Sequence, residues 1–189
     1  MSSDYEIQQG ATFRASFVYF QPTLNVKAIT AISQSIRPVV AVTAHGIPAG
    51  TEWPVWIRGV KGMAKINHAA EDVEDQATAY LATRIDANSV SINADTTDFA
   101  AYASGGELAY NPPVDLTGCS ARMDVRRRLS DTAAVLSLSS ATAAPASRLT
   151  ITPASGRIDK EITDEDTAAI DWKSAVWDLE VVHLQGRDG

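Results

Sequence analysis

The densest group of acidic side chains in this chain is formed by Asp164, Glu165 and Asp166. Neighbouring carboxylates can carry out general acid–base catalysis when one site holds them in different protonation states. Thr163 stands directly before them, and a threonine followed by acids is typical of the first turn of a helix. Asp166 occupies the position where a capping box prefers glutamate, so the capping pattern is partial. We therefore expect a short helix within 163–170 and no catalytic role for its acids.

The histidines are His45, His68 and His183, and none has another histidine, a cysteine or an acid at the spacing of metal ligands. His45 precedes a glycine turn, so its ring is expected to hydrogen-bond the backbone. His183 is expected to be structural. Residues 71–75 are acidic but lack the alternating ligands and central glycine of an EF-hand. The sequence therefore predicts a solvated loop there, no metal site and no cofactor.

Catalytic motifs are not recognisable in this sequence: it contains no nucleophile elbow, phosphate-binding loop or dinucleotide-binding fingerprint. The single cysteine, Cys119, lies among small residues, cannot form an internal disulfide and is expected to be a buried structural thiol. The basic run at 126–128 would alternate between the faces of a strand. That favours a solvated strand end or an ion pair between subunits over phosphate binding. We expect a protein that is not an enzyme.

Aromatic side chains are the remaining candidates for recognition. Trp53 and Trp56, with Pro54 between them, could stack on a sugar or anchor a partner protein. The alternative is that one of the two packs in the core and the other is exposed. The complete set of candidate interface residues is Trp53, Trp56, Tyr102, Val181 and His183.

Composition and charge narrow the function classes. The chain has 189 residues and a formal net charge of −7, which allows one large or two small domains. No apolar run approaches the roughly 18 residues that span a bilayer. Residues 1–4 lack the basic start and apolar core of a secretory signal peptide. Acidic residues are spread along the chain, and no extended basic surface is visible in the sequence, so nucleic-acid binding is not expected. Without a long apolar run, membrane insertion is not expected either.

Short alternating segments separated by polar turns run through the whole chain, and a period near two predicts strands. These segments are residues 11–20, 27–34, 39–44, 53–60, 78–85, 89–93, 117–127, 133–139, 148–152, 157–162 and 175–184. The two glycines at 104–106 predict a tight turn, and residues 95–102 suggest one helical turn. Spacing of this kind predicts an all-β fold with sandwich or barrel architecture.

Motifs at the two ends of the chain resemble one known domain. They are Tyr5-x-Ile7-x-x-Gly10-x-Thr12-Phe13, the run 114–126 that begins Val-Asp-Leu-Thr-Gly, Gly156-Arg157-Ile158, and 178–181 ahead of 185–189. Together they are similar to the N-terminal immunoglobulin-like domain of phage baseplate upper proteins and related tail proteins. The resemblance implies a discontinuous β-sandwich made of residues 1–26 and 110–189.

The segment 27–109 between those halves resembles a second module. Its motifs are 29–32, 42–46, Gly50, 57–63, Ile66-Asn67 and 102–106. They are similar to a small β-barrel repeat of phage proteins that is itself like a domain of ubiquitin-activating enzymes. The likeness is one of fold only, and no adenylation or thiol chemistry is implied, because Cys119 lies outside the module.

The two resemblances imply a non-enzymatic virion structural protein of a tailed phage, made in the host cytoplasm. It would be a tail or baseplate adaptor that joins other virion proteins and assembles as a homo-oligomer in a symmetric complex. One alternative is a module that binds a host-surface glycan or receptor through Trp53, Trp56 and Tyr102. Another is a neck or head-decoration protein. Domains of the flanking type continue past residues 188–189 into a further strand, so the last strand is expected to leave an edge open to strand addition.

Overall fold

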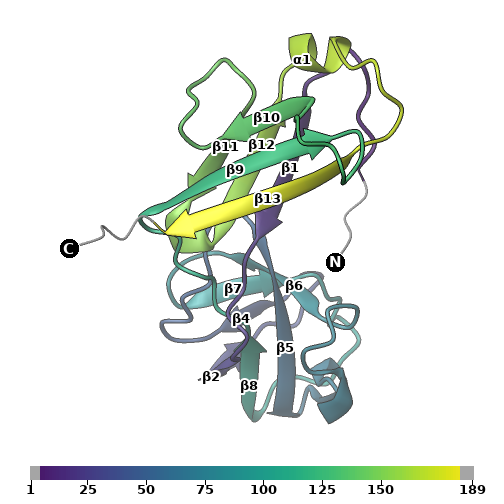
Figure 1. The fold of residues 1–189 in the computed structure, drawn as a ribbon. Helices are drawn as coiled ribbons and strands as arrows, with labels where there is room; N and C mark the ends of the chain where they lie inside the picture. The colour runs from purple at the N-terminus through teal and green to yellow at the C-terminus, as the bar shows by residue number, and fades with distance from the viewer. Residues whose placement is uncertain (1–4, 184–189) are drawn as a thin grey trace, which may run out of the picture. The chain divides into compact units, whose positions relative to one another are not determined.

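The computed structural model describes residues 5–183 and divides the chain into two compact units (Figure 1). Unit 1 runs to Tyr19 and resumes at Val114, and unit 2 runs from Phe20 to Pro113. The junctions expected after residue 26 and before residue 110 both fall inside unit 2. The reason is that 25–28 pairs with 107–110 in the sheet of that unit. The sequence motif at 185–189 lies outside the described residues.

The described fold is all-β, as the alternating segments predict. Its strands are β1 (Phe13–Val18), β2 (Asn25–Ala28), β3 (Ala31–Ile32), β4 (Val39–Ala41), β5 (Glu52–Lys61), β6 (Tyr80–Arg84), β7 (Ser89–Ile92), β8 (Ser104–Tyr110), β9 (Cys119–Arg126), β10 (Leu136–Ser139), β11 (Arg148–Thr152), β12 (Arg157–Ile162) and β13 (Val176–His183). The helical elements are short: η1 (Ala64–Ile66), η2 (Ala70–Asp72), η3 (Pro153–Ser155) and α1 (Asp164–Ala168).

Unit 1 consists of two three-stranded antiparallel sheets with the orders β1-β12-β11 and β10-β9-β13. Their strands alternate, so one face of each sheet is apolar. Leu149 and Ile158 from the first sheet and Met123 and Leu138 from the second belong to one buried cluster. The two sheets therefore share a single hydrophobic core, and their other faces carry the polar side chains.

Unit 2 is one curled sheet with the strand order β2-β8-β5-β6-β7-β4-β3. The long strand β5 pairs with β6 through its first half and with β8 through its second half. The strands at the two ends of this order, β2 and β3, are consecutive in the chain and are separated by Ile29 and Thr30. The amides of these two residues donate 2.9 Å hydrogen bonds to the carbonyls of Gly106 and Ala41 respectively. One short segment thus continues the ladder from β8 to β4.

Residues 104–106 begin strand β8, so the prediction of a tight turn there is wrong. A Cβ atom placed on Gly106 would lie 2.4 Å from Cγ2 of Val60 on β5. Glycine is favoured here by this close approach of a neighbouring strand and by a positive φ of 95°, and not by a chain reversal. The helical turn suggested within 95–102 is also absent: Phe99 donates its amide to the Thr96 carbonyl in an isolated turn.

Candidate functional site

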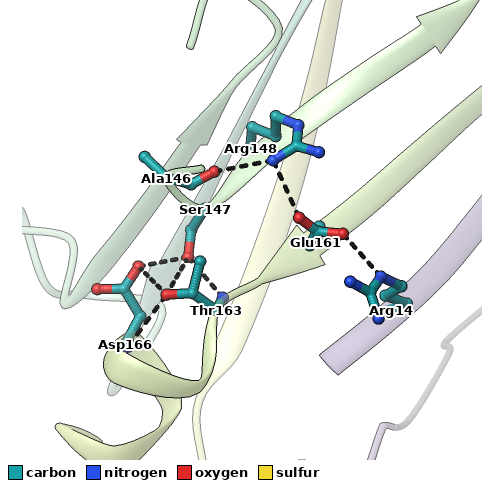
Figure 2. Close-up of polar contacts among 7 residues, drawn as sticks. All are labelled: Arg14, Ala146, Ser147, Arg148, Glu161, Thr163 and Asp166. Carbon is teal, nitrogen blue, oxygen red and sulfur yellow. Dashed lines mark hydrogen bonds and ion pairs between the residues drawn. The ribbon is translucent and has the colours of Figure 1, made fainter. Parts of the chain in front are cut away.

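The acidic cluster is accounted for by the helix that follows it. The Thr163 hydroxyl caps α1 by accepting a 3.3 Å hydrogen bond from the Asp166 amide, which confirms the predicted helix start. Ser147 donates its hydroxyl to the Asp166 carboxylate and accepts the Thr163 amide at 2.9 Å. Figure 2 shows that these three residues are joined by hydrogen bonds at the N-terminus of α1. The arrangement ties the loop before β11 to the helix start.

Charged side chains cross the outer face of the sheet β1-β12-β11 beside this cap (Figure 2). Glu161 lies between Arg14 at 2.7 Å and Arg148 at 2.9 Å. The hydrogen bond from Arg14, together with the charges of both guanidinium groups, holds the pKa of the Glu161 carboxyl below its ordinary value. These ion pairs are at the surface, where such pairs contribute little to stability.

The indoles of Trp53 and Trp56 are both fully buried in unit 2, so the expectation that one is exposed is wrong. The Trp53 ring nitrogen donates to the Asn111 carbonyl at 2.9 Å, and the Trp56 ring nitrogen donates to the Asp75 carbonyl at 3.1 Å. The alternating pattern of β5 predicted one inward and one outward face, but residues 53–57 are buried on both faces because the curled sheet and its loops enclose them. Neither indole offers a surface for stacking on a sugar.

The other candidate interface residues are partly or fully accessible. The Tyr102 hydroxyl donates to the Gly105 carbonyl at 3.0 Å and to the Ile29 carbonyl at 3.2 Å. It therefore links the start of β8 to the segment between β2 and β3. Val181 on β13 packs against the core of unit 1, whereas His183 at the end of that strand is exposed. The Thr117 side chain and amide, with a smaller contribution from His183, lower the pKa of Asp115.

The remaining histidines are held by the backbone, as predicted for His45. The buried His45 ring accepts the Ile47 amide at 2.9 Å and lies 2.8 Å from the Asp86 carbonyl. The His68 ring accepts the Ile57 amide at 3.0 Å and lies 2.9 Å from the Thr78 carbonyl. Each ring therefore acts as one acceptor and one donor, which is the pattern of a neutral imidazole that joins two loops.

The basic run at 126–128 forms ion pairs within unit 1. Arg126 contacts Asp124 and Asp178, both at 2.9 Å, and Arg127 contacts Asp171 at 2.7 Å. Cys119, expected to be buried, is half-buried beside the core. Within residues 5–183, no group of three or more His, Cys, Asp or Glu side chains is arranged to hold a metal ion. None of the described helices has the length and hydropathy needed to cross a bilayer.

The most unusual group in unit 1 is one that the sequence reasoning missed, the amine of Lys160. Lys160 is 2% exposed and occupies a core position of β12, between Ile158 and Ile162 on the inward face. Its nitrogen lies 3.7 Å from the ring centre of Tyr5 and 5.0–5.2 Å from those of Phe13, Phe17 and Trp177. The available signal was the alternation itself, because Ile-x-Lys-x-Ile places a lysine in phase with two core residues.

No carboxylate among residues 5–183 pairs with this amine. Burial in an apolar environment disfavours the charged form and lowers the pKa of Lys160 to about 8. The surrounding rings offset part of that cost through cation–π attraction. At neutral pH the interior of unit 1 therefore holds a positive charge that has aromatic neighbours and, in the part of the chain that the structure describes, no ion-paired carboxylate.

The rings of Tyr5, Phe13, Phe17 and Trp177 around the Lys160 amine are called the aromatic cage below. A cavity of about 590 Å³ adjoins Lys160 and this cage. Its lining is mostly apolar, with two further charged side chains, and consists of Tyr5, Glu6, Ile7, Gln9, Met123, Val125, Leu136, Lys160, Ile162, Ile170, Trp172, Lys173, Ser174, Ala175 and Trp177. Strands of both sheets and the segments 5–9 and 170–175 contribute to it. Small-molecule sites are typically apolar cavities of about 300–1,000 Å³ with a few placed polar groups, and this cavity has those properties.

The chain matches no known protein-family model, and no curated protein matches its sequence.

Proposed function

We propose that the protein is a non-enzymatic structural component of a tailed-phage virion, in which unit 1 is an immunoglobulin-like β-sandwich and unit 2 an inserted small β-barrel. The sandwich reading is supported by two antiparallel sheets with one shared core. The barrel reading is supported by the segment 25–32, which pairs at one end with β8 and at the other with β4. A segment that joins the two ends of the strand order is what a closed barrel requires.

The observation that carries the proposal is the backbone conformation of the motif glycines. Gly10, Gly118 and Gly156, on which the resemblance to the tail-protein domain rests, have φ angles of 77°, 73° and 61°. Left-handed conformations of this kind favour glycine. A Cβ atom on Gly156 would also lie 2.6 Å from the Tyr19 carbonyl oxygen, where the two halves of unit 1 meet. The shared motif residues are thus the ones that this fold needs, which supports a common architecture.

Assembly would use the outer edge of β13. Among the described strands β13 pairs only with β9, so its second edge presents backbone donors and acceptors to solvent. The outer face of the same sheet is covered by cross-strand ion pairs from Arg126 to Asp178 and from Arg122 to Glu180. A charged face of this kind is suited to solvent. An open edge is suited to adding a strand from a neighbouring subunit, and repeated addition would build a symmetric complex.

Immunogold labelling of intact phage particles from the source of the chain tests the virion assignment. Label on the distal tail would support the baseplate adaptor. Label at the neck or on the head would keep the structural role and replace the baseplate position. Absence of label on both intact and disrupted particles, with the antibody binding the purified protein in the same buffer, would overturn the proposal.

A further inference from the structure

Within residues 5–183, no carboxylate forms an ion pair with the buried amine of Lys160. Charged groups inside proteins are usually paired, because removing an ion from water costs several kcal/mol. The rings of Tyr5, Phe13, Phe17 and Trp177 attract the ammonium through their quadrupoles, but they carry no negative charge. Among the described residues this positive charge is therefore not compensated, and an anion placed beside it would supply the missing interaction.

The adjoining cavity gives such an anion a place to bind. Lys160, Tyr5 and Trp177 belong both to the group of rings around the amine and to the cavity lining, so the cavity adjoins this group. The rest of the lining includes apolar core side chains of both sheets, among them Met123 and Ile162. A ligand that fits must therefore join an anionic group to an apolar body. Its volume must also be well below the cavity's 590 Å³.

We propose that this cavity is a binding site for small monocarboxylic acids with an aromatic or aliphatic body, and that the ligand carboxylate pairs with the Lys160 ammonium. The charged groups that face the site besides Lys160 are Glu6 and Lys173. Lys173 has the same sign as Lys160 and favours an anion, whereas Glu6 disfavours a second negative group on the ligand. One carboxylate thus fits the charge of the site better than two. A cationic ligand is excluded because the lysine already fills the aromatic cage.

Calorimetric titration of the full chain with phenylacetate, and with neutral phenylacetamide of nearly the same shape, tests the proposal. We expect phenylacetate to bind at least tenfold more tightly than the amide. Lys160→Met should abolish this preference, while the control substitution Lys61→Met, at an exposed lysine of unit 2, should change phenylacetate affinity by less than about threefold. Equal binding of acid and amide, or an unchanged preference in Lys160→Met, would overturn the proposal.

A second measurement on the unmodified protein does not depend on a core substitution. Pairing with a carboxylate favours the charged amine, so bound phenylacetate must raise the pKa of Lys160. With ¹³C-labelled lysine, the Lys160 side-chain resonance should titrate at least one pH unit higher in saturating phenylacetate, and the three lysines outside the cavity, Lys27, Lys61 and Lys65, should not shift. An unshifted Lys160 titration, or no binding by millimolar phenylacetate, would show that the cavity is not a carboxylate site.

Discussion

The side-chain nitrogen of Lys160 lies 3.7 Å from the centre of the Tyr5 ring, although the two residues are separated by most of the chain. The contact joins the N-terminal segment to the central strand β12 of its sheet. It places a positive charge where core packing would ordinarily require an apolar side chain. Both the stability of unit 1 and its proposed ligand depend on this arrangement.

Replacing Lys160 by methionine should stabilise unit 1 at neutral pH by about 1 kcal/mol, because a well-packed apolar side chain of similar length avoids the cost of burying a charge. The free energy of unfolding in urea at pH 7 measures this. Lys173→Met, which changes an exposed lysine at the same cavity, is the control and should leave stability within about 0.5 kcal/mol. A strongly destabilised Lys160→Met would mean that the cation–π contacts outweigh desolvation.

Stability should also depend on pH through Lys160. The pKa of this amine is about 8 in the folded chain and 10.5 when unperturbed. Between these values the unfolded chain binds the proton that the folded chain has released, so the unfolding free energy rises with pH. Urea titrations at pH 7 and pH 9.5 should show a gain in the wild-type chain that is missing from Lys160→Met. An equal gain in both chains would assign the effect to other groups.

The glycines of unit 1 offer a comparison of two substitutions with similar backbone strain. Gly10 and Gly156 both have positive φ, so alanine costs about 1 kcal/mol at either position. At Gly10 the added Cβ meets nothing within 4 Å, whereas at Gly156 it would lie 2.6 Å from a backbone carbonyl oxygen. Gly156→Ala should therefore lose at least 2 kcal/mol more than Gly10→Ala, by the steric mechanism that produces large losses. Chemical denaturation of the two variants side by side measures the difference, and equal losses would contradict it.

Burial of the Trp53 indole predicts a structural effect of its removal. Trp53→Ala should destabilise unit 2 by about 3–5 kcal/mol, because it leaves a large void and an unpaired Asn111 carbonyl. Hydrogen exchange followed by peptide mass analysis can assign the loss of protection to 20–113. Ile36→Ala, at a side chain that is 72% exposed in the same unit, is the matched control and should leave protection unchanged. Wild-type hydrogen-exchange protection of unit 2 in Trp53→Ala would show that the indole does not stabilise the core of this unit.

The open edge of β13 predicts an effect on assembly that leaves folding intact. Val182 on this strand is 45% exposed, and a lysine on an edge strand opposes the addition of another strand. Val182→Lys should be incorporated into particles at least tenfold less than wild type, with an unchanged melting temperature. Thr150→Lys, on the edge strand β11 of the other sheet, is the control and should be incorporated normally. Equal incorporation of the two variants would remove β13 from the assembly contact.

The sequence by itself determined features that depend on near neighbours. Alternation of side chains indicated most of the strands, because a period of two follows from the backbone of a single strand. The threonine at 163 and the acids after it predicted the start of α1, since a cap needs only residues three positions apart. His45 before a glycine turn predicted a ring held by the backbone for the same local reason.

Only the tertiary structure decided which faces are covered and by what. Trp53 and Trp56 are both buried because the sheet of unit 2 curls around β5, and no local period encodes curling. Residues 104–106 form a strand because they pair with β5, and glycine is needed at 106 because Val60 of that strand approaches it closely. Lys160 is caged because segments from both ends of the chain bring aromatic rings to one inward position. Whether a side chain is buried depends on the residues that pack against it across the core, and those residues are distant in sequence.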